Sequence, residues 1–251
     1  MALIPGNLDA LVAEAVSHFW RVRNAQAASQ RERGSLDHGF RSAVTGGAQM
    51  DGFVSLISNI INKVGVADAK VFRKDSLELP GFFRPTKEWD IVVVVDGQLL
   101  AAVEAKSQVG PSFGNNFNNR TEEAIGSAVD LWTAFREGAY RASARPWLGY
   151  LFLLEECPRS LAPVRVKEPH FPVFPEFQGA SYAKRYELLC RKLVLERHYE
   201  AAALLMSSSE AGAQGRYSEP SMDLSFRHFA ASLAGHVAGI AAQQNEGPGK
   251  S

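Results

Sequence analysis

The sequence has few cysteines, no long apolar run and no excess of charge, and each of these absences excludes a class of protein. Its 251 residues include 2 Cys, Cys157 and Cys190, too few and too far apart for a disulfide framework or a zinc site. No apolar run reaches the roughly 18 residues that span a bilayer. The first residues lack the basic and apolar segments of a secretory signal. We therefore expect a cytoplasmic protein.

The formal net charge is zero, with 27 basic and 27 acidic residues. A protein that binds nucleic acid is usually basic, so this balance counts mildly against that function. The charge is unevenly distributed, however, because basic side chains gather in residues 21–41 and 184–198. Each segment is either a phosphate-contacting face or an ordinary solvated helix surface, and both interpretations remain open. The 6 histidines show no metal-ligand spacing.

Apolar periodicity predicts helices over residues 8–28, 51–63, 119–139, 181–206 and 221–242. Strands are predicted near 71–73 and 146–154, and two more flank the Asp96-Gly97 turn. Strands that follow helices, with an inserted hairpin, indicate an α/β (α+β) fold with a mixed central β-sheet flanked by α-helices. We expect one domain over 1–251, with a proline-rich irregular connection over 158–180 and a disordered tail over 243–251.

Charged residues stand at the ends of the two apolar strands around Asp96-Gly97. Asp90 precedes the first strand, and Glu104-Ala105-Lys106 follows the second. Two carboxylates can hold Mg²⁺ beside a phosphate, and a lysine can stabilise an attacking hydroxide. This set of side chains is typical of a metal-dependent nuclease.

The register of this hairpin decides whether those side chains can share a site. A strict two-residue turn at Asp96-Gly97 pairs Val95 with Gln98 and places Asp90 and Glu104 on opposite faces. A three-residue loop or a β-bulge places Asp90, Glu104 and Lys106 on one face. The shared-site hypothesis therefore requires one of these two irregularities.

Asp90 and Glu104-Ala105-Lys106 resemble the PD-(D/E)xK nuclease motif, with Trp89-Asp90 where the motif's name has Pro-Asp. The continuous runs 88–94 and 104–124 closely resemble the XhoI-type type II restriction endonucleases, and the similarity is densest over 80–140. The resemblance implies a homodimeric, Mg²⁺-dependent enzyme that cuts both strands of duplex DNA at the palindrome CTCGAG. It also implies 5′ overhangs and a cognate methyltransferase that protects host DNA. A two-fold symmetric protein agrees with a palindromic site.

The motif assigns a role to each of its residues. Asp90 and Glu104 are expected to hold the metal, with the Ala105 carbonyl as a candidate third ligand. Lys106 is expected to orient the attacking water and offset charge at the phosphate. Gln108, on the same strand face, is a candidate contact to the phosphate or its water. The candidates for an additional acidic ligand are Glu14, Glu32, Asp51 and Glu78.

A polar stretch after Lys106 is predicted to be a long loop that ends at a helix capped by Asn119. Asparagine can pair with adenine and arginine with guanine, and CTCGAG offers both bases. The alternative is turn and cap chemistry, which asparagine also favours and which suits Asn119 better. As a group, the DNA-contact candidates are Asn115, Asn116, Asn118, Asn119 and Arg120.

Two other functions remain to be distinguished. A structure-selective or repair nuclease would explain Asp90, Glu104 and Lys106, but not the match of the asparagine-rich run to XhoI-type enzymes. A DNA-binding protein without catalysis, derived from a nuclease, would not require an intact acidic pair and lysine.

Overall fold

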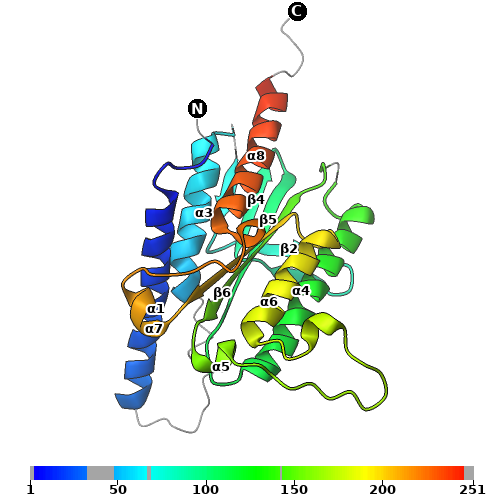
Figure 1. The fold of residues 1–251 in the computed structure, drawn as a ribbon. Coiled ribbons are helices and arrows are strands. Elements are labelled where there is room, and N and C mark those ends of the chain that lie inside the picture. The colour runs from blue at the N-terminus through cyan, green and yellow to red at the C-terminus, as the bar shows by residue number, and fades with distance from the viewer. Residues whose placement is uncertain (1–2, 33–47, 67–68, 142, 246–251) are drawn as a thin grey trace, which may run out of the picture.

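A mixed five-stranded sheet forms the centre of the molecule (Figure 1). The computed structural model describes residues 3–32, 48–66, 69–141 and 143–245. The strand order is β1-β4-β5-β6-β7, in which β1, β4 and β5 are antiparallel neighbours and β5, β6 and β7 run parallel. The strands are Lys70–Phe72 (β1), Ile91–Val95 (β4), Gln98–Gln108 (β5), Trp147–Glu155 (β6) and Ala201–Ser207 (β7). The predicted fold class is confirmed.

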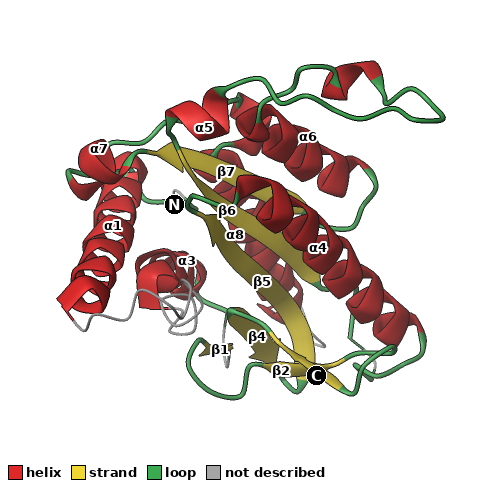
Figure 2. Cartoon of the chain, turned by 90° about the horizontal axis from the view of Figure 1, so that it is seen from below, coloured by secondary structure: helices red, strands yellow, loops and turns green. Residues whose placement is uncertain are grey.

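Helices cover both faces of this sheet (Figure 2). The helices α1 (Leu8–Glu32), α3 (Asp51–Val64) and α8 (Phe226–Asn245) pack on one face, with Ile91 and Val93 of β4 beneath them. The helices α4 (Phe113–Arg136) and α6 (Tyr182–Leu195) pack on the other face, with Val92 and Ala102 beneath them. Alternate residues of the central strands therefore enter two separate cores, which explains why these strands are apolar on both faces.

A small hairpin, which was not among the predicted strands, lies beside the main sheet. Its strands β2 (Glu78–Pro80) and β3 (Thr86–Glu88) pair antiparallel, with Glu78 opposite Glu88. The turn between them approaches α4 so closely that a Cβ on Gly81 would lie 2.3 Å from Oδ2 of Asp130. A glycine is therefore needed at this position, and the hairpin is fixed against α4.

The helix predicted over 181–206 is wrong in its second half. Helix α6 ends at Leu195, Arg197 has a positive φ of 58°, and the chain then forms β7 from Ala201 to Ser207. Alanine and leucine favour helices intrinsically. Here, however, every residue of the segment is buried, and it pairs with β6. Tertiary packing overrides propensity at this position.

The 158–180 connection and the C-terminal segment agree in part with the expected domain organisation. The connection over 158–180 is irregular apart from α5 (Pro158–Leu161) and a 3-10 turn, η2 (Pro175–Phe177). Helix α8 continues to Asn245, so the expected tail does not begin at Gln243, and residues 246–251 lie outside the described part. The other short elements are η1 (Ala48–Met50), α7 (Ser209–Ala213) and η3 (Met222–Leu224).

Of the two basic segments, only 184–198 lies wholly within the described residues. In residues 184–198, Lys184 and Arg191 pair with Glu187, and Lys192 pairs with Glu196. This favours the solvated helix surface for that segment. Most of 21–41 lies outside the described residues. Within the described ranges, no helix is long and apolar enough to cross a membrane.

Candidate active site

The hairpin of β4 and β5 has both a two-residue turn and a bulge. Asp96 and Gly97 have positive φ values of 51° and 74°, and Val95 pairs with Gln98. The register then shifts between Val94, which pairs with Leu99, and Val93, which pairs with Ala101. One extra residue on β5, Leu100, therefore stands without a partner on β4. The irregularity required for a shared site is present, in its bulge form.

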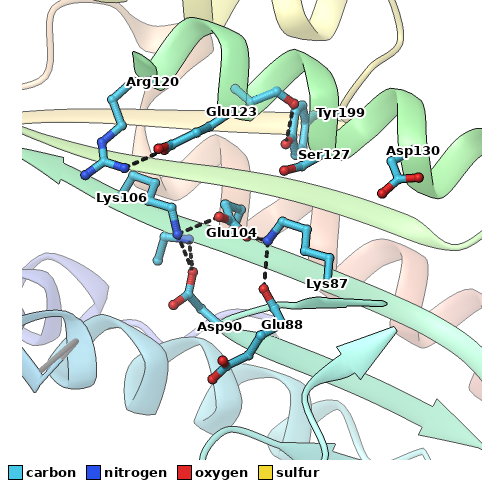
Figure 3. Close-up of polar contacts among 12 residues, drawn as sticks. Lys87, Glu88, Asp90, Glu104, Lys106, Arg120, Glu123, Ser127, Asp130 and Tyr199 are labelled. Atoms are coloured by element: carbon cyan, nitrogen blue, oxygen red, sulfur yellow. Dashed lines mark hydrogen bonds and ion pairs between the residues drawn. The ribbon is translucent and has the colours of Figure 1, made fainter. Parts of the chain in front are cut away.

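With this bulge, Ile91 pairs with Val103, so Asp90 and Glu104 both lie next to that pair, and Lys106 lies two residues beyond Glu104 on the same face of β5. The Asp90 N–H donates to the Val103 carbonyl over 3.1 Å, and the Ala105 N–H donates to Asp90 Oδ2 over 2.8 Å. Lys106 Nζ lies 2.5 Å from Glu104 Oε1 and 3.5 Å from Asp90 Oδ2. Figure 3 shows the lysine between the two carboxylates. The three motif residues form one cluster.

Lys87 of β3 is a fourth member of this cluster, and the sequence analysis did not name it. Its Nζ lies 2.5 Å from Glu104 Oε2, so each oxygen of Glu104 faces a different lysine (Figure 3). The burial of Glu104 is the signal that could have led to Lys87. A carboxylate on a buried strand needs compensating charge for both of its oxygens.

Burial and ion pairing act on these groups in opposite directions. Burial alone would raise the pKa of Glu104, but the ammonium groups of Lys106 and Lys87 outweigh it and hold that pKa below its ordinary value. Burial raises the pKa of Asp90, and nearby Lys106 offsets only part of the effect. Burial would lower the pKa of Lys106, but Glu104 and Asp90 together leave it raised. Burial lowers the pKa of Lys87 because Glu104 compensates incompletely.

The donor set fits a hard divalent cation. Asp90 and Glu104 present carboxylate oxygens from neighbouring strands, and Glu104 is held ionised by two positive charges. Mg²⁺ accepts few protein ligands because it keeps several waters. Among the described residues, Asp90 Oδ1 takes part in no hydrogen bond, and the Asp90 side chain is 32% exposed. These two residues could hold the ion. Its positive charge would then balance the two carboxylates, which Lys106 now neutralises in part.

No third acidic residue joins the pair within the described part of the chain, where no cluster of three His, Cys, Asp or Glu side chains is suited to a metal. Glu14 and Asp51 are exposed on α1 and α3, the helices that pack on the other face of the sheet. Glu78 is exposed on β2, and the side chain of Glu32 lies outside the described set. The proposal of a further acidic ligand stays a prediction.

Gln108 is on the expected strand face but turned into the protein. It is 2% exposed, its Nε2 donates to the Val109 carbonyl over 3.0 Å, and its Oε1 accepts from the Tyr186 hydroxyl over 3.4 Å. A contact with a phosphate would require this side chain to leave both partners. The contact of Gln108 with the phosphate or its water stays a prediction.

The polar stretch after β5 is a helix, and the loop prediction is wrong. Helix α4 begins at Phe113, with Ser112 rather than Asn119 at its N-cap. Phe113 and Phe117, one helical turn apart, contact the rings of Tyr182 and Tyr186 on α6. This i, i+4 aromatic spacing was the signal for a helix, but the asparagines around it indicated a loop.

The helix divides the DNA-contact candidates by exposure. Asn115, Asn118 and Asn119 are exposed, whereas Asn116 is half-buried. Arg120 is half-buried, and its Nη1 lies 2.5 Å from Glu123 Oε2. Figure 3 shows the Arg120 side chain on the same side of the sheet as Lys106. The exposed asparagines project from the first turns of a helix near the cluster.

Comparison with known proteins finds one family model and several relatives. Residues 29–219 match the family model described as restriction endonuclease XhoI. The chain is 57% identical over 217 residues to type II restriction enzyme BstVI of Geobacillus stearothermophilus, covering 84% of this chain and 97% of the relative. It is 52% identical over 198 residues to type II restriction enzyme XhoI of Xanthomonas vasicola, covering 78% and 79%. It is 49% identical over 172 residues to type II restriction enzyme AbrI of Azospirillum brasilense, covering 68% and 77%. No solved structure matches the chain.

Proposed function

Because the chain belongs to the XhoI family of type II restriction endonucleases, we propose that it cuts both strands of duplex DNA at CTCGAG in a Mg²⁺-dependent reaction. We further propose that it leaves 5′ overhangs and acts as a homodimer, in which each copy cuts one strand of the palindrome. A single domain over 1–251 would carry this activity in the cytoplasm, where a cognate methyltransferase protects the host's own sites.

One observation carries the catalytic part of this proposal. The bulge brings Asp90, Glu104 and Lys106 to one strand face, with Lys106 Nζ within 2.5 Å of Glu104 Oε1 and 3.5 Å of Asp90 Oδ2. Asp90 and Glu104 would hold Mg²⁺, which would supply positive charge at the phosphate and lower the pKa of a bound water. The protein's own contribution is to hold the two carboxylates rigidly on adjacent strands.

Lys106 is proposed to act directly on the reacting groups. Its side chain is 25% exposed, so its ammonium can reach both the carboxylates and a phosphate that approaches from solvent. Once a cation balances the carboxylates, the ammonium can donate to a phosphate oxygen or orient the attacking water. Such donors act strongly because the surrounding protein excludes water.

Recognition is proposed to involve the first turns of α4. Asn115, Asn118 and Asn119 are exposed there, and an asparagine can bond both N6 and N7 of adenine. Asn116 and Arg120 are half-buried, so they would contribute only after a local rearrangement. For Arg120 this means opening its ion pair with Glu123 before it contacts guanine or a phosphate.

The test is digestion of a sequenced plasmid with and without Mg²⁺, with the cut ends mapped by run-off sequencing. Discrete Mg²⁺-dependent cuts at CTCGAG support the whole proposal. Discrete cuts at another palindrome retain the enzyme class and reject the proposed site. Smearing or branch-dependent cutting indicates a structure-selective nuclease, and binding of duplex DNA without cutting indicates a protein that has lost catalysis.

A further inference from the structure

The two lysines on Glu104 are held very differently. Among the described residues, Lys106 has only carboxylate partners, Glu104 and Asp90, and these are the two groups proposed to bind the metal. Lys87 has three partners of different kinds. Its Nζ lies 2.5 Å from Glu104 Oε2, donates to the Glu88 carbonyl over 2.7 Å, and sits 4.3 Å from the centre of the Trp89 ring. A cation that replaced Lys106 would leave the last two contacts of Lys87 intact.

Burial supports the same distinction. The Lys87 side chain is 13% exposed and that of Lys106 is 25% exposed, while Trp89 beneath Lys87 is 2% exposed. An ammonium over an indole ring, when largely removed from water, is held by a further attraction to the ring face. Lys87 also extends from a strand whose hairpin is fixed to α4 through Asp130. The backbone of Lys87 is therefore held in place by the docked hairpin.

We propose that Lys87 is a positioning residue that stays on Glu104 Oε2 throughout the reaction and keeps Oε1 directed toward Asp90. The inference rests on the proposed nuclease function. Lys106 is then the lysine released to the phosphate when a divalent cation binds, and Lys87 is the one that never leaves. Glu104 can consequently offer the cation only one oxygen, so the chain contributes one oxygen from Glu104 and at least one from Asp90.

The proposal predicts an unusual pair of effects for Lys87→Met, which keeps the apolar stem and removes the charge. Loss of a positive charge beside Glu104 should tighten binding of a divalent cation, whereas loss of orientation should slow cleavage. A residue that only supports folding would not produce a gain and a loss together. We expect Mn²⁺ to bind at least three-fold more tightly and the single-turnover cleavage rate to fall at least ten-fold.

The experiment is calorimetric titration of the full-length protein with Mn²⁺ in the absence of DNA, followed by single-turnover cleavage of a CTCGAG duplex. Lys167→Met serves as the matched control because Lys167 is exposed in the 158–180 connection, and it should match the wild type in both assays. Lys106→Met should also tighten Mn²⁺ binding but should reduce cleavage at least a hundred-fold. Unchanged Mn²⁺ affinity for Lys87→Met, or cleavage within two-fold of the wild type, overturns the proposal.

A second variant covers the case in which Lys87→Met does not fold. Lys87→Arg keeps the positive charge, so its Mn²⁺ affinity should stay within two-fold of the wild type. Its single-turnover cleavage rate should lie within ten-fold of the wild-type rate. Tighter Mn²⁺ binding by Lys87→Arg contradicts the assigned role of the charge. Since the titration contains no DNA, it tests the effect of the Lys87 charge on metal binding even if the wild type binds Mn²⁺ and cuts no DNA. That result would refute the nuclease proposal alone.

Discussion

Two buried carboxylates on the same side of the sheet have opposite surroundings. Glu104 and Asp130 are 4% and 3% exposed. Asp130 accepts from the backbone N–H groups of Phe82 and Phe83 at 2.7 and 2.8 Å and from Arg84 Nε at 2.6 Å. Glu104 faces two lysine ammonium groups instead. Both carboxylates are compensated, but by groups of different mobility.

The difference shows which buried charge is available for chemistry. Backbone N–H groups belong to the turn they stabilise, so Asp130 cannot exchange them for another ligand without unfolding that turn. Lysine side chains can move by rotation about single bonds, so an incoming cation can replace one of them at Glu104. Burial and a lowered pKa are common to both residues. The hydrogen-bond and ion-pair partners, rather than burial, distinguish Glu104 in the candidate active site from Asp130, which holds the β2–β3 turn.

The largest expected effect is on cleavage. Asp90→Ala removes one of the two proposed metal ligands, and we expect single-turnover cleavage to fall by about 10³-fold, a typical loss for a group that stabilises charge at the reacting centre. The control is Asp75→Asn, an exposed acidic residue in the turn before β2, which should cleave like the wild type. Cleavage by Asp90→Ala within ten-fold of the wild type would remove Asp90 from the site.

The next effect is on stability. Asp130→Ala leaves two backbone N–H groups without their acceptor, and we expect the free energy of unfolding to fall by about 3 kcal/mol. Denaturant unfolding measures this loss. Asp223→Ala is the matched control because Asp223 also pairs with an arginine, Arg191, but its side chain is 53% exposed. Equal losses from the two substitutions would show that burial of Asp130 does not matter.

A third prediction separates the two carboxylates by their response to metal. Mg²⁺ at a hundred times its dissociation constant should stabilise the wild type by about 2.7 kcal/mol, because it binds only the folded state. Asp130→Asn should retain this gain, whereas Glu104→Gln should lose most of it. Thermal unfolding with and without Mg²⁺ provides the comparison. A full metal response in Glu104→Gln would contradict the assignment of Glu104 as a ligand.

The smallest effect is a pH dependence. Burial would raise the pKa of Asp130, but the Phe83 N–H, Arg84 and the Phe82 N–H outweigh it and hold the pKa below its ordinary value of 3.8. The unfolded state then binds a proton more readily, so the stability contributed by Asp130 is present above pH 3.8 and is lost as the pH falls further. The stability of the wild type should therefore approach that of Asp130→Asn below pH 3.8. A difference in the free energy of unfolding that stays constant with pH would refute this role of the Asp130 charge.

The sequence predicted the motif cluster because strand periodicity is strict. Once a bulge was allowed, alternation alone placed Asp90, Glu104 and Lys106 on one face, as the structure has them. Lys87 could not be found in this way because its strand, Thr86–Glu88, is only three residues long and has no periodic pattern. Its contact with Glu104 depends on how the β2–β3 hairpin docks, which is a tertiary property.

Local composition misled the prediction in two segments, in opposite directions. Residues 201–206 have the alanine and leucine content of a helix, yet they form a buried strand because they pair with β6. Residues 113–120 have the asparagine content of a loop, yet they are helical because Phe113 and Phe117 pack against α6. In both segments, contacts with residues distant in sequence outweigh intrinsic propensity.

The unpaired residue at Leu100 makes the active site sensitive to insertions and deletions at a position that carries no charge. With the present two-residue turn, removing this one apolar residue would shift the strand by one position and turn Glu104 and Lys106 toward the opposite core. Adding two residues to the hairpin would preserve the face, whereas adding one would not. Among relatives, the distance between the aspartate and the glutamate should therefore vary in steps of two, unless the turn or the bulge changes with it.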